Sequence, residues 1–90
     1  KVLKNSHVKK SFVANGAMIN GTVENSIIGR NVVIGKDTIV RNSIIFSDSK
    51  IASGIKIENA IIDKSVTIEK QQEIIGQSDN PVYIHEGDIV

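Results

Sequence analysis

The four residues Asn25-Ser26-Ile27-Ile28 recur 17 positions later as Asn42-Ser43-Ile44-Ile45, and after another 17 as Asn59-Ala60-Ile61-Ile62. Two further apolar columns keep the same spacing: Ile34, Ile51 and Ile68 in one, and Val40, Ile57 and Ile74 in the other. A unit this short cannot bury an apolar face alone, so neighbouring units must stack on one another. The repeat therefore predicts a solenoid.

Aliphatic residues recur within each unit at intervals of six, six and five, as in the series Ile28, Ile34, Val40, Ile45. This spacing predicts three short strands per coil joined by sharp corners, which makes a triangular prism of parallel strands about 4.8 Å apart. Aromatic residues are only 3% of the chain, and the dominance of Ile and Val favours stacked sheets. We expect one all-β domain over residues 1–90, with about five coils. The regular coils are expected over 11–68 and a terminal cap over 69–90.

Two polar columns are predicted, the first at a corner of the prism and the second on its outside surface. Asn25, Asn42 and Asn59 form the first, because asparagine tolerates the left-handed conformation and its amide groups can hydrogen-bond along the axis. The second column contains Glu24, Arg41 and Glu58, so opposite charges should alternate one rung apart. Such a ladder fixes the register of the coils more than it stabilises them.

A further apolar column consists of Phe12, Ile27, Ile44 and Ile61. Successive strand residues point to opposite faces, so Ile44 and Ile45 do not both enter a prism with straight walls. Either this column faces outward, or the corner bends enough to bury both residues. We favour the outward orientation, which predicts a contact surface along the four residues.

The segments 28–33 and 34–39 resemble the hexapeptide repeat, and this resemblance implies an all-β, single-stranded left-handed parallel β-helix, an exception to the usual right-handed crossover. Residues 11–28 include a coil of only 15 residues, followed by Thr22-Val23-Glu24-Asn25-Ser26. Together with residues 40–45, they resemble the C-terminal domain of bacterial glucose-1-phosphate adenylyltransferase, also called ADP-glucose pyrophosphorylase. The tail, 80–84 and 87–90, is more similar to the regulatory companion subunit.

The resemblance implies a parent protein that joins ATP and glucose 1-phosphate to give ADP-glucose and pyrophosphate in cytoplasmic glycogen biosynthesis. That chemistry belongs to an N-terminal nucleotidyltransferase domain, whose glycine-rich loop matches no part of this chain. No catalytic, cofactor-binding or metal-binding residues are therefore expected here. The expected role is oligomerisation and allosteric regulation.

The partners implied are the nucleotidyltransferase domain of the same chain and further subunits of a homo- or hetero-oligomer. Because the chain begins at a lysine, we expect it to be a piece of a longer protein. A phosphate-bearing effector would need cationic groups. The candidates are Lys9, Lys10, Arg30, Lys36 and Arg41.

Other classes of function have less support. The near absence of aromatics, with no basic stripe beyond the first ten residues, argues against nucleic-acid binding. No apolar run is long enough to span a membrane, and the lack of cysteine is compatible with a reducing cytoplasm. The alternative is a hexapeptide-repeat acyltransferase that acts as a trimer with a histidine near its interface. His7 precedes the regular coils and His85 lies in the terminal turn, so neither is expected on the prism wall.

Overall fold

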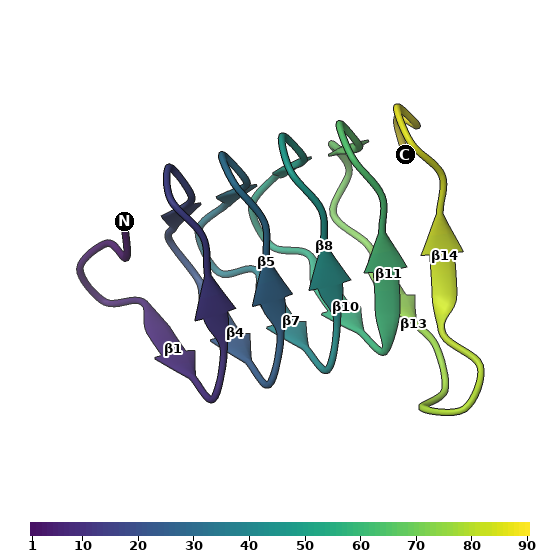
Figure 1. Cartoon of the computed structure of the whole chain (residues 1–90), viewed down its shortest axis with the longest axis horizontal. Helices are drawn as coiled ribbons and strands as arrows, with labels where there is room; N and C mark the ends of the chain where they lie inside the picture. The colour runs from purple at the N-terminus through teal and green to yellow at the C-terminus, as the bar shows by residue number, and fades with distance from the viewer.

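The computed structural model describes residues 1–90, which wind into a three-sided tube of parallel strands (Figure 1). The first side contains β1 (His7–Lys9), β4 (Thr22–Glu24), β7 (Ile39–Arg41), β10 (Lys56–Glu58) and β13 (Glu73–Ile75). The second side contains β2 (Phe12–Val13), β5 (Ile27–Ile28), β8 (Ile44–Ile45), β11 (Ala60–Ile62) and β14 (Val82–Ile84). The third side contains β3 (Met18–Ile19), β6 (Val33–Ile34), β9 (Lys50–Ile51) and β12 (Thr67–Ile68). No helix in the chain could cross a membrane.

Each coil contributes one strand to each side, so four coils are complete and partial coils flank them. Val2 pairs with Ile19 before the first coil, and Ile89 pairs with Thr67 after the fourth. The first coil is short, as predicted, because Phe12 aligns with Ile27 only 15 positions later. The winding is therefore continuous from one end of the chain to the other.

The aliphatic columns predicted from the repeat stack inside the tube. Ile34 pairs with Ile51 and Ile51 with Ile68, while Val40, Ile57 and Ile74 align on the first side. All of them belong to one buried core of 17 residues that runs the length of the tube. Because every strand has an inward side chain in this core or packed against it, no coil has an apolar interior of its own.

Residues 69–90 cover the fourth coil by continuing the winding. β13 pairs with β10 and β14 with β11, both in parallel. Tyr83 aligns with Ile61 although the two are 22 positions apart, five more than the repeat length. The extra residues lie in the 76–81 loop, where Gln77 and Asn80 exchange two backbone hydrogen bonds in a tight turn. The loop folds back beside the corner between the first and second sides.

The corner column of asparagines lies where the sequence predicts it. Asn25, Asn42 and Asn59 all have positive φ, between 48° and 53°, which lets the backbone turn sharply from the first side to the second. Asn25 Nδ2 donates to Asn42 Oδ1 at 2.8 Å, whereas Asn59 Nδ2 donates to the carbonyl of Gly76 at 3.2 Å. The predicted amide ladder is thus confirmed at its first rung and ends on the backbone of the last coil.

The alternating charge column is also confirmed. Arg41 Nε donates to Glu24 Oε1 at 2.8 Å, and Arg41 Nη1 lies 3.9 Å from Glu58 Oε2. The hydrogen bond from Arg41 lowers the pKa of Glu24 below its ordinary value. These side chains are partly exposed to solvent, which screens the pairs, so the pairs align the coils and add little stability.

Candidate functional site

Five apolar side chains point outward from the second side in one straight column, the apolar stripe. Strand pairing sets them in register, one per coil: Phe12, Ile27, Ile44, Ile61 and Tyr83. Phe12 is 65% exposed, Ile27 49% and Tyr83 46%, whereas Ile44 and Ile61 are half-buried. Ile45 is fully buried, so of the two arrangements left open for Ile44 and Ile45 the straight wall is the correct one. The contact role of the stripe stays a prediction.

Tyr83 was not recognised from the sequence as a member of the stripe. The 17-residue period places its column at position 78, and the 76–81 loop displaces the tyrosine by five residues. The signal that could have found it is the alternation Val82-Tyr83-Ile84, in which Ile84 is buried and Tyr83 is exposed. Stripe membership follows from the strand pairing of β14 with β11.

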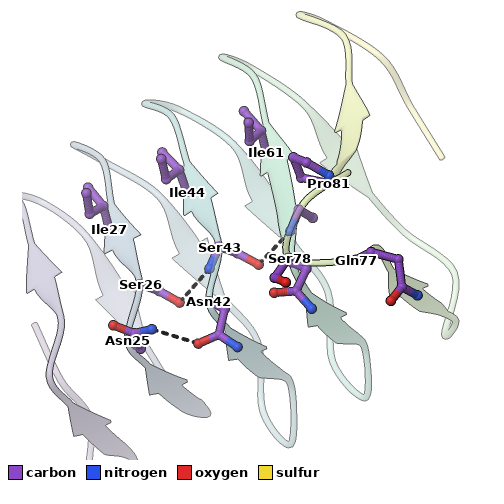
Figure 2. Close-up of a pocket in the computed structure, with 12 residues that line it drawn as sticks. Asn25, Ser26, Ile27, Asn42, Ser43, Ile44, Ile61, Gln77, Ser78 and Pro81 are labelled. Carbon is purple, nitrogen blue, oxygen red and sulfur yellow. Dashed lines mark hydrogen bonds between the residues drawn. The ribbon is translucent and has the colours of Figure 1, made fainter.

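A shallow groove of about 630 Å³ runs beside the stripe along the corner between the first and second sides. Figure 2 shows Ile27, Ile44 and Ile61 in a row along one wall, with Gln77, Ser78 and Pro81 closing the end. The corner asparagines and the small residues that follow them complete the lining: Asn25, Ser26, Asn42, Ser43, Asn59 and Ala60. None of the lining side chains is ionisable, so the groove offers apolar surface and neutral hydrogen-bonding groups and suits binding better than proton transfer.

Tyr83 is held in place by two neighbours at the C-terminal end of the stripe. Its hydroxyl donates to the carboxylate of Asp63, and its ring meets that of His85 edge-on at a centroid distance of 4.7 Å. The same hydrogen bond raises the pKa of Tyr83 and, with the backbone N–H of Lys64, lowers the pKa of Asp63. A fixed aromatic ring loses little conformational entropy when a partner covers it.

The five candidate effector-binding cations do not form one cluster. One open hollow of about 330 Å³ is lined by Lys9, Lys10 and Arg41. Arg41 in this hollow already forms an ion pair with Glu24. Lys36 lines a different hollow with Lys4, and Arg30 lines neither. The structure thus brings together three of the five, with a carboxylate among them.

The two histidines lie in different coils. His7 begins β1 in the first coil, and His85 follows β14 in the last, so about 19 Å of stacked strands separates them along the axis. No three His, Asp or Glu side chains are grouped closely enough to hold a metal ion. His85 does reach the second side through its contact with Tyr83, although it was expected to lie away from the prism wall.

Comparison with curated proteins and with solved structures gave no match. A family model described as "GlmU-like, C-terminal hexapeptide" matches residues 2–81. This match and the three parallel sheets confirm the predicted fold class, a left-handed hexapeptide-repeat β-helix, without singling out glucose-1-phosphate adenylyltransferase. Because the match spans most of the chain and its repeats are those that stack in the structure, the chain belongs to the GlmU-like C-terminal hexapeptide family.

Proposed function

We propose that this domain is the assembly and regulatory β-helix of a glucose-1-phosphate adenylyltransferase or of its non-catalytic companion subunit. In this role the domain performs no chemistry. It holds a nucleotidyltransferase domain and further subunits in fixed positions, and the apolar stripe is the surface that they cover. The resemblance of residues 11–28 and of the tail to that enzyme supports the choice of parent protein.

The observation that carries the proposal is the stripe itself. Five large apolar side chains stand in register on one side of a tube whose core is already complete without them. A contiguous apolar column on a soluble protein marks a surface that another protein covers. The adjoining groove extends this surface with amide and hydroxyl groups, which can pair with a partner's backbone.

The first test compares two substitutions that add the same charge to outward positions. Ile44→Asp places a carboxylate in the middle of the stripe, whereas Val33→Asp places one on the third side of the tube. In the complete protein, Ile44→Asp is expected to weaken subunit association at least tenfold in sedimentation equilibrium, with Val33→Asp unchanged. Equal association of the two variants would remove the basis of the proposal.

The second test concerns the parent enzyme. The coding sequence upstream of Lys1 is expected to encode a nucleotidyltransferase domain with a glycine-rich nucleotide loop. The complete protein, or its complex with a catalytic subunit, is then expected to bind ATP and glucose 1-phosphate. A different upstream domain would leave the assembly role in place and exclude this parent.

A second candidate function is a hexapeptide-repeat acyltransferase that acts as a trimer. The match to the GlmU-like hexapeptide family is consistent with it, and the contact between His85 and Tyr83 sets a histidine at the end of the exposed stripe. This candidate predicts a three-subunit mass by light scattering. It also predicts that coenzyme A is released as the acetyl group of acetyl-coenzyme A passes to an amine or hydroxyl acceptor, and that this release disappears in His85→Ala. A two-subunit or four-subunit mass with no such release would decide against it.

A further inference from the structure

The two ends of the tube carry opposite charge. Residues 1–10 hold four lysines and no acidic side chain, a formal charge of +4. Residues 69–90 hold five acidic side chains against one lysine, a formal charge of −4. The coils between them are nearly neutral, with six basic and five acidic side chains over 11–68. The charge asymmetry therefore runs along the axis, parallel to the apolar stripe.

We propose that the stripe packs against the stripe of a second copy of this chain with the two tubes antiparallel. This inference rests on the proposed assembly function and specifies the partner and its orientation. In this arrangement a two-fold axis lies parallel to the strands and passes beside Ile44, which meets the partner's Ile44. Phe12 then meets the partner's Tyr83, and Ile27 meets the partner's Ile61.

Charge decides between the two orientations that a two-fold axis allows. Parallel tubes would bring the two basic ends together and the two acidic ends together, which opposes association. In antiparallel tubes each basic end lies beside an acidic end of the partner. The two-fold axis generates two equivalent copies of this favourable contact. The charge distribution thus selects the antiparallel dimer over the parallel one.

The same symmetry pairs particular surface charges. Lys10 lies at the corner immediately before β2, and Asp79 lies in the 76–81 loop immediately before β14. Both residues are exposed, and both lie at the edge of the second side from which its strands begin. A two-fold axis parallel to the strands places this edge of one copy against the same edge of the other copy. Lys10 therefore lies beside the partner's Asp79.

The surface area of the second side predicts how tightly the two copies bind. The molecule measures 31 × 24 × 22 Å, so one side offers at most roughly 750 Å² to a partner. A standard protein interface takes about 800 Å² from each partner. We therefore expect a reversible dimer that dissociates on dilution.

Single cysteines test the geometry cleanly, because the chain has none of its own. With a short bismaleimide linker, Ile44→Cys is expected to cross-link to itself. Phe12→Cys and Tyr83→Cys are each expected to stay uncross-linked alone and to cross-link when the two proteins are mixed. Met18→Cys, exposed on the third side, is the matched control and stays at background. Self-cross-linking of Phe12→Cys and of Tyr83→Cys would show a parallel arrangement and overturn the proposal.

Charge reversal provides an independent test. At low ionic strength Lys10→Asp and Asp79→Lys are each expected to weaken the dimer several-fold, and the double variant is expected to recover the original association. Aspartate suits position 10 because the backbone there has a φ of 51°, which aspartate tolerates. A double variant weaker than both single variants would contradict the pairing.

The outcomes separate this inference from the assembly function. If Ile44→Asp weakens association in the complete protein but the cysteine pattern is absent, the stripe is a contact surface for a different partner and the antiparallel dimer is wrong. A monomeric or trimeric mass at every concentration overturns the dimer in the same way. If Ile44→Asp leaves association unchanged, both proposals fall.

Discussion

The hydroxyl of Ser26 joins two coils by accepting the backbone N–H of Ser43 at 3.1 Å while donating to the carbonyl of Glu24 at 2.7 Å. Ser43 repeats the arrangement one coil later, accepting from the N–H of Ala60 at 3.0 Å and donating to the carbonyl of Arg41 at 2.8 Å. Each serine thus replaces a backbone hydrogen bond at a corner where the strands are interrupted. Buried N–H groups at the corner are satisfied in this way.

Ser43→Ala is expected to destabilise the domain by about 1–3 kcal/mol, because it leaves the buried N–H of Ala60 without its acceptor. Urea unfolding followed by circular dichroism measures the change. Ser53→Ala, at an exposed corner, is the matched control and is expected to change stability by less than about 0.5 kcal/mol. Equal stability of the two variants would mean that water replaces the hydroxyl.

Ile45→Asp is expected to unfold the domain, whereas Ile44→Asp one position earlier is expected to preserve the fold. Ile45 is fully buried, so the substitution places a carboxylate in the apolar core at a cost of several kcal/mol. The β-sheet signal in circular dichroism and the dispersion of amide signals in NMR distinguish the two variants. Loss of structure in both would show that the outward column supports the fold itself.

Asp63→Asn is expected to lower the pKa of Tyr83 toward the ordinary value of 10.0, because the hydrogen bond to the carboxylate is the largest cause of its rise. Tyr83 is the only tyrosine in the chain, so the ultraviolet absorbance of tyrosinate reports on it alone. Asp79→Asn removes the same charge from an exposed position without touching Tyr83 and serves as the control. A titration curve unchanged by Asp63→Asn would mean that the two side chains do not interact in solution.

The pH dependence of stability follows from the same pair. The pKa of Asp63 is lowered in the folded state, so its contribution to stability is fully present above the ordinary aspartate pKa of 3.8. That contribution is lost as the pH falls through the lower pKa of the folded state. Asp63→Asn is therefore expected to lose less stability than the original chain between neutral pH and strongly acidic pH. Thermal unfolding over this pH range measures the difference.

Arg41→Glu is expected to destabilise the domain by about 1 kcal/mol, because it stacks three carboxylates on successive rungs of the first side. Added salt should restore part of the loss, since screening weakens repulsion between exposed charges. Arg41→Gln, which removes the charge and keeps a polar side chain, is the control and should show a smaller effect with little salt dependence. A loss that salt does not change would point to packing of the arginine side chain and not to its charge.

The sequence by itself determined the prism, because a repeat of 17 residues with aliphatic side chains at intervals of six, six and five fits only a coil with three corners. It also determined the register of the coils, since columns such as Ile34, Ile51 and Ile68 align in one way only. The amide and charge columns followed from the same overlay. Periodic side chains report local geometry directly, and in a solenoid each coil contacts only its neighbours.

Only the tertiary structure decided that Tyr83 is the last residue of the stripe and that Asp63 contacts it. The 76–81 loop moves Tyr83 out of the period, and it is the pairing of β14 with β11 that restores it to the column beside Ile61. The contact of Tyr83 with Asp63, 20 positions away, likewise depends on how far the loop displaces the last coil. The repeat length predicts the position of a residue only where the chain follows the repeat without insertions. After an insertion such as the 76–81 loop, the register is set by backbone hydrogen bonds between neighbouring coils.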